Sequence, residues 1–166
     1  MKSRLSVLLP LLLAVSLPAV AEAPRVSRHD TVTVQADEAW EDSANDAVHF
    51  RGHFEIRASD WQVTADQATL YGPLDDPDRV VAEKGAKIRL NTAGTSDHKP
   101  VAGEADRIEY VRKGDLVTLT GSARLHKQEN TMQSGTIEYN RATDSFRAGG
   151  SRGGVKIRFT PRASER

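Results

Sequence analysis

The chain has 166 residues, enough for one domain with its own core but too few for two large domains. It carries 23 basic and 23 acidic residues, interspersed along the sequence, so it lacks the basic face that nucleic-acid binding requires. It contains no cysteine, which excludes a disulfide scaffold and a thiol nucleophile.

The first 21 residues have the organisation of an export signal. Lys2 and Arg4 are basic, residues 5–17 are mostly apolar, and Ala19-Val20-Ala21 fits the small-x-small cleavage pattern. The apolar run contains a proline and is shorter than the roughly 20 residues of a transmembrane helix. We therefore expect cleavage after Ala21 and export of the protein, followed by a flexible lead-in over residues 22–30. The alternative is an uncleaved membrane anchor.

From Thr31 to Phe159 the sequence predicts β-strands and no helix, because apolar residues do not recur at helical spacing for long enough. The clearest segment spans residues 101–127, where the turn Arg112–Asp115 separates two strands. Apolar residues alternate with polar ones on both sides of this turn: Ile108 and Tyr110 before it, and Val117, Leu119 and Leu125 after it. We expect a single domain over residues 31–159 and a disordered tail over residues 160–166.

Four segments of about thirty residues resemble one another, over residues 32–59, 61–90, 101–127 and 131–159. The first three share an Ala-Asp pair in the first strand and a glycine in the second: Ala36-Asp37 with Gly52, Ala65-Asp66 with Gly85, and Ala105-Asp106 with Gly121. The fourth has Ser134-Gly135 in place of the pair. Hairpin repeats that cannot each bury their own apolar face predict a stacked β architecture.

The apolar alternation changes phase at the Ala-Asp pairs. Trp61 and Val63 lie on one alternation, whereas Ala68 and Leu70 lie on the other. A β-bulge absorbs such a slip, so we predict a bulge or sharp bend at each pair, giving a curved sheet. The alternative is a break between two separate strands.

The aligned apolar faces predict a trough able to hold lipid, although a trough lining and a packed core look the same in sequence. The candidate lining residues are Val32, Val34, Phe50, Phe54, Ile56, Val63, Leu70, Ile88, Leu90, Ile108, Tyr110, Val117, Leu119, Leu125, Ile137 and Tyr139. The last strand alternates Val155, Ile157 and Phe159 with Lys156 and Arg158, a pattern common on edge strands.

Signals for catalysis are weak, and we expect no enzyme and no cofactor. The histidines are scattered; His49 and His53 could share a strand face, but no third metal ligand is evident. Residues 149–156 (GGSRGGVK) lack the Gly-Lys-Ser/Thr ending of a phosphate loop, and we interpret them as a flexible turn.

Several of these segments resemble the LptA/OstA family of periplasmic lipopolysaccharide transport proteins. They are VHFRGHFEI (48–56), VTADQATLY (63–71), ADRIEYVRKGDLVTLTGSARL (105–125) and SGTIEYN (134–140), and the likeness extends from about Val32 to Phe159. In the fourth repeat Gly135 departs from the acidic residue usual in the family.

The resemblance implies an all-β fold of antiparallel strands wound into an incompletely closed jelly roll, a curved trough of two sheets built from about four hairpin repeats. It also implies a periplasmic bridge that carries lipopolysaccharide, by its lipid A part, from the inner-membrane protein LptC to the N-terminal domain of outer-membrane LptD. By matching position, Val32, Val34, Leu90 and Tyr110 would line the groove, and Arg112 would lie at its mouth.

Family members join end to end, edge strand to edge strand. The resemblance therefore implies assembly edges at Thr31, Val32, Thr33, Val34 and Gln35 and at Val155, Lys156, Ile157, Arg158 and Phe159, which would give head-to-tail self-association. Two alternatives remain: a membrane-anchored jelly-roll partner of the same pathway, and a ligand-free structural β-solenoid or adhesin module with a packed, dry interior.

Overall fold

The computed structural model describes residues 31–91, 100–150 and 154–159. The expected signal peptide, lead-in and C-terminal tail lie outside these residues. The described chain forms ten strands: β1 (Thr33–Gln35), β2 (Glu38–Asp42), β3 (Ala47–Arg57), β4 (Trp61–Tyr71), β5 (Arg79–Leu90), β6 (Val101–Val111), β7 (Leu116–Lys127), β8 (Asn130–Asn140), β9 (Ser145–Gly149) and β10 (Lys156–Arg158).

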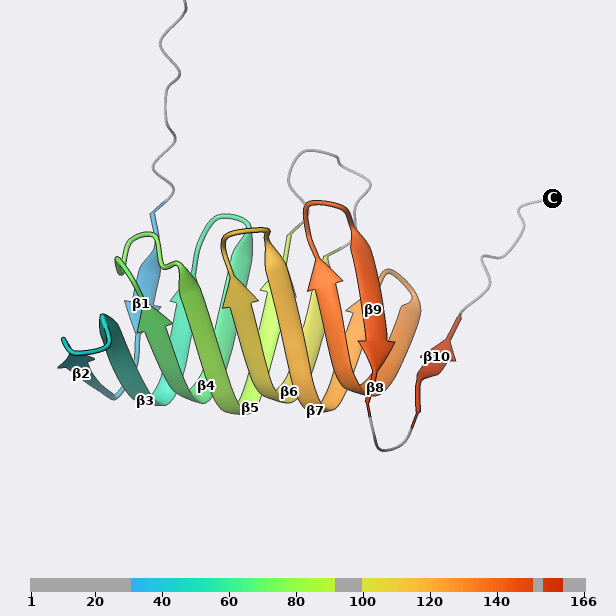
Figure 1. Ribbon diagram of the computed structural model, residues 1–166, viewed down its shortest axis with the longest axis horizontal. Coiled ribbons are helices and arrows are strands. Elements are labelled where there is room, and N and C mark those ends of the chain that lie inside the picture. Colours follow the sequence, from blue (N-terminus) through green and yellow to red (C-terminus); the bar gives the residue numbers. More distant parts are fainter. Residues whose placement is uncertain (1–30, 92–99, 151–153, 160–166) are drawn as a thin grey trace, which may run out of the picture.

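All ten strands belong to one antiparallel sheet that folds over on itself (Figure 1). The six long strands, β3 to β8, each cross a fold line and contribute one half to each of two leaves. The front leaf contains β2 and β9 as its outer strands, and the rear leaf contains β1 and β10. Within the described residues, no pairing joins the first strands to the last. The expected open, antiparallel all-β trough is therefore confirmed.

The fold line is a row of β-bulges at the middle of the long strands. Between Arg51 and Phe54 two residues of β3 face only Asp66 of β4, and the pairing resumes on the other side. β7 repeats this arrangement with Gly121 and Ser122, whose φ angles are +77° and +49°. Two consecutive residues in the left-handed region turn the strand sharply, which allows one sheet to become two facing leaves.

The predicted irregularity at each Ala-Asp pair is present, but the extra residue lies elsewhere. β3, β5 and β7 carry the bulged residues, while Asp66 and Asp106 are the single residues opposite them. The strand with the Ala-Asp pair has one residue at the bend where its neighbouring strand has two. Its apolar alternation therefore changes phase at the bend. At Ala36-Asp37 the alternative holds: β1 and β2 are separate strands.

The space between the leaves is filled by apolar side chains. The described residues include no buried polar or charged residue. Cross-strand neighbours such as Leu119 and Ile137 are both 0% exposed, so the facing leaves exclude water from each other's inner surface. Burial of this apolar surface, at about 25 cal/mol per Å², is the main stabilising contribution to the fold.

We predict that Gly121→Ala lowers the free energy of unfolding by about 1–3 kcal/mol, the usual cost of a strained left-handed residue. The φ angle of Gly121 is +77°, and an added Cβ would also collide with the carboxylate of Asp106. Gly149→Ala is the control, because Gly149 has no positive φ angle and open space around its Cβ position. Urea denaturation measures both variants, and equal unfolding midpoints would contradict the proposed role of the bulge.

Candidate functional site

The sixteen candidate lining residues all lie on the inner face of the folded sheet. Fourteen of them are buried, and Val32 and Val34 are partly buried against the same apolar cluster. The structure therefore brings the predicted set together in one continuous surface that runs through both leaves. Trp61, Met132 and several alanines belong to the same cluster, and sequence alternation around the bulges could have identified them.

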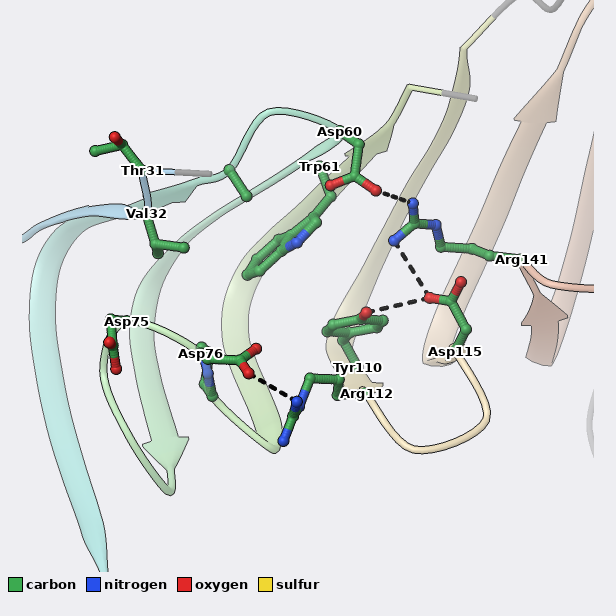
Figure 2. Close-up of a pocket in the computed structure, with 12 residues that line it drawn as sticks. Thr31, Val32, Asp60, Trp61, Asp75, Asp76, Tyr110, Arg112, Asp115 and Arg141 are labelled. Atoms are coloured by element: carbon green, nitrogen blue, oxygen red, sulfur yellow. Dashed lines mark hydrogen bonds and ion pairs between the residues drawn. The ribbon is translucent and has the colours of Figure 1, made fainter. Parts of the chain in front are cut away.

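A cavity of about 880 Å³ lies at the mouth, the edge opposite the fold line, where the hairpin turns of the two leaves face each other (Figure 2). Val32, Trp61 and Tyr110 form its apolar part, and the rings of Trp61 and Tyr110 lie 5.3 Å apart between their centroids. Arg112 lies at this mouth, where the family resemblance places it. Ala58 and Pro77 add to the apolar part, and the other lining residues are polar or charged, so the cavity joins a charged rim to the apolar interior.

Arg141 connects the two sides of the mouth. It follows β8 on the front leaf, and its guanidinium binds the carboxylate of Asp60 in the β3–β4 turn of the rear leaf (Figure 2). Its other nitrogen lies 3.2 Å from the carboxylate of Asp115. Burial alone would lower the pKa of Arg141, but the hydrogen bond to Asp60 and the nearby carboxylates raise it. The Arg141 side chain is 13% exposed, the lowest exposure of any side chain in the described ion pairs.

Tyr110 is held in the same cluster. Its hydroxyl donates to the Asp115 carboxylate at 3.1 Å, while its ring is buried beside Trp61. Burial and the adjacent negative charge of Asp115 raise the pKa of Tyr110 to about 12. One face of the mouth thus has an aromatic side chain whose ring belongs to the interior and whose hydroxyl belongs to the charged rim.

A second ion pair also crosses the mouth. Lys127, at the end of β7 in the rear leaf, places its Nζ atom 2.6 Å from the carboxylate of Asp144 in the β8–β9 turn of the front leaf. The Tyr139 hydroxyl donates to the same carboxylate at 2.7 Å. Burial raises the pKa of Tyr139, and the hydrogen bond to Asp144 adds to this effect. The β8–β9 turn, residues 141–144, therefore contacts the rear leaf at two points.

Backbone hydrogen bonds join the turns along the front rim of the mouth. Gly72 N–H donates to the carbonyl of Asp46, Arg112 N–H to that of Asp78, and Arg141 N–H to that of Asp115. Each bond links one hairpin turn to the next, so the front rim is a continuous hydrogen-bonded edge. The cross-leaf ion pairs are attached to the end of this edge.

The ends of the trough expose edge strands. The expected edges near residues 31–35 and 155–159 correspond to β1 and β10 of the rear leaf. Sequence reasoning missed the front-leaf edges β2 and β9, which are short strands beside turn-rich segments. The apolar residues exposed toward the C-terminal end are Phe146, Val155, Ile157 and Phe159, and Trp40 is exposed on β2.

The two central histidines do not form a metal site with each other. The His49 ring stacks on Trp40 and bonds with Thr69 Oγ1, whereas the His53 ring lies 2.8 Å from the Asp37 carboxylate at the fold line. Among the residues that the structure describes, no group of three or more potential metal ligands occurs.

Tyr110 gives a test of the mouth geometry. Because its pKa is raised by folding, its contribution to stability is full below pH ~10, the value of an unperturbed phenol, and is lost as the pH rises toward about 12. We expect Tyr110→Phe to reduce the loss of stability between pH 10 and 12 compared with wild type. Urea unfolding midpoints measured across this range check the prediction. Parallel pH curves for the two proteins would contradict the buried position of the phenol.

The described residues contain no helix long and apolar enough to cross a membrane. No curated protein sequence matches the chain. Among solved structures, the crystal structure of LptH from Pseudomonas aeruginosa matches with a TM-score of 0.71 and 21% sequence identity, covering 81% of this chain and 98% of that one. LptH is described as the LptA homologous periplasmic component of a conserved lipopolysaccharide transport device, and the likeness shows a shared jelly-roll fold.

The family model for the LptA/(LptD N-terminal domain) lipopolysaccharide transport protein matches residues 33–145, which span β1 to the start of β9. This match covers well over half of the chain and includes most of the apolar interior and both sides of the mouth. The chain belongs to the LptA/LptD N-terminal-domain family of lipopolysaccharide transport proteins.

Proposed function

We propose that the protein is a periplasmic bridge that carries lipopolysaccharide passively, with its acyl chains between the two leaves. The observation that carries the proposal is the uninterrupted apolar interior, which runs through both leaves without a buried polar or charged residue in the described chain. An acyl chain of about twelve carbons gains about 10 kcal/mol on leaving water, at about 0.8 kcal/mol per methylene. Such an interior removes the barrier to crossing an aqueous compartment without any covalent chemistry.

We further propose that the trough receives lipid from LptC, delivers it to the N-terminal domain of LptD, and joins copies of itself head to tail. Each leaf contains eight antiparallel strands, so its first and last strands run in opposite directions. Placing β9 beside β2 of a second copy, and β10 beside β1, would continue the antiparallel order in both leaves.

The charges at the two ends support this orientation. β2 carries Glu38, Glu41 and Asp42, whereas the opposite end carries Arg147 on β9 and Lys156 and Arg158 on β10. In this joint Arg147 of β9 would lie beside the acidic β2, and Lys156 and Arg158 of β10 would lie beside β1, which has no charged residue. A net acidic end meeting a net basic end favours head-to-tail contact and disfavours contact between like ends. The exposed apolar residues Phe146 and Ile157 would be covered in the same joint.

A ligand-free structural module remains the second candidate, because the interior is closely packed as that candidate predicts. Nine large side chains of the interior are less than 2% exposed. Membership of a lipopolysaccharide transport family favours the bridge, and direct capture of lipid separates the two candidates.

We predict that a photo-crosslinking benzoylphenylalanine at position 110 captures lipopolysaccharide in living cells. The residue replaces a tyrosine whose ring already faces the interior, so the protein should tolerate it. The same amino acid at Thr120, an exposed outer-face position beside the buried Leu119, is the matched control. Absence of lipid adducts at position 110, or equal yields at both positions, would leave the structural module as the better account.

We predict that truncation after Gly154 disrupts self-association, because only the β9–β2 half of the joint remains, but leaves lipid capture largely intact. The truncation removes β10 and the exposed apolar residues around it, which contribute to one edge but not to the central interior. Light scattering over a range of protein concentrations measures the mass of the assembly. If the truncated protein still assembles and loses lipid binding, the edge and groove assignments are reversed.

A further inference from the structure

The interior between the leaves is closely packed, although a lipid carrier must make room for its cargo there. Phe54, Leu119 and Ile137 are at most 1% exposed, so the leaves leave no room between them for an acyl chain at these positions. Lipid can enter only if the leaves separate. The parts of the structure that join the leaves therefore determine how entry occurs.

At the fold line, the leaves are joined by continuous strands without intervening ladder pairs. The backbone pairing of β3 with β4 and of β6 with β7 stops on one side of the bulge and resumes on the other. Rotation of one leaf about this line changes backbone angles in residues such as Gly121 and Ser122 without breaking the ladders of either leaf. The fold line has the geometry of a hinge.

At the mouth, the two ion pairs of the β8–β9 turn span the gap between the leaves: Arg141 with Asp60, and Lys127 with Asp144. These charges regain water when they separate, so an ionic contact at the rim resists opening less than an apolar contact of the same size would. The apolar interior behind them exchanges its own packing for contacts with acyl chains. The ionic rim and the interior can thus open together.

We infer that the β8–β9 turn is the gate of the trough: its Arg141–Asp60 and Lys127–Asp144 ion pairs hold the mouth closed, and both must break before the acyl chains of an amphiphilic lipid pass between the leaves. This inference rests on the proposed function and names the residues that control entry. After Arg141 leaves Asp60, it keeps Asp115 as a partner 3.2 Å away, so the open gate does not leave an isolated buried cation. The contact between the Trp61 and Tyr110 rings lies beside these ion pairs at the mouth, and the two rings would separate when the gate opens.

A reversible chemical lock tests the gate. The native chain has no cysteine, so the double variant Asp60→Cys/Arg141→Cys can be bridged by a short bis-methanethiosulfonate reagent and released by reductant. Glu104→Cys/Arg124→Cys is the control: these residues form a 2.6 Å ion pair between neighbouring strands of the rear leaf, away from the mouth. The readout is uptake of fluorescently labelled lipopolysaccharide by the purified protein.

We expect the bridged 60/141 variant to lose at least tenfold in uptake and to recover on reduction, while the bridged control binds like its reduced form. We also expect Asp60→Asn to speed uptake several-fold, because it weakens the closed state; Glu104→Gln should not. A merely structural role for Asp60 would slow uptake in both the locked and the weakened variants.

Equal uptake by the locked and released 60/141 variant would overturn the gate while leaving lipid carriage intact. Failure of wild-type protein to take up lipopolysaccharide would instead overturn the proposed function, whatever the lock does. The two failures are therefore distinguishable.

Discussion

A sheet with one apolar face must cover that face, and here the sheet covers it by folding over on itself. Every long strand contributes inward-facing residues to both leaves, so each half of a strand is buried by halves of other strands. The bulges at the fold line make this possible, because they let one strand change direction without losing its place in either ladder. The mouth, and the edge strands β1 and β2 at one end and β9 and β10 at the other, follow from this folding of the sheet.

The same constraint explains why the leaves are joined by the backbone at the fold line and by side chains at the mouth. The fold line is made by backbone geometry, with left-handed residues such as Gly52 and His53 opposite an aspartate. The mouth is made by side chains, with Arg141 and Lys127 reaching between leaves that share no backbone pairing there in the part of the chain that the structure describes. A structure that is continuous on one side and joined by ion pairs on the other has a preferred direction of opening. That asymmetry suits a carrier whose cargo has apolar chains and a polar head.

Much of the fold could be predicted from sequence because alternation and repetition are local signals. The inward positions, such as Leu119 and Tyr110, follow from the period of two, and the repeats indicated the stacked hairpins. The strand that carries each bulge could not be predicted, because the phase change appears in β4 and β6 while the extra residue lies in the neighbouring strand. The phase change in the alternation of one strand does not tell which of the two paired strands contains the extra residue.

The cross-leaf ion pairs were also beyond sequence reasoning. Asp60 and Arg141 are separated by 81 positions, and each lies in a polar turn where a charged residue is ordinarily solvated. Only the folding of the sheet brings those turns to the same rim. The front edges β2 and β9 were missed for a related reason: five-residue strands beside turns have too short an alternation to recognise.

The central claim is that the leaves separate to exchange their packing for acyl chains. Pulsed electron paramagnetic resonance tests it most directly, with spin labels on cysteines introduced at Lys113 in the front rim and Gln128 in the rear rim, both exposed. Saturating lipopolysaccharide should shift the distance distribution between these labels to longer values. An unchanged distribution with lipid bound would contradict the account.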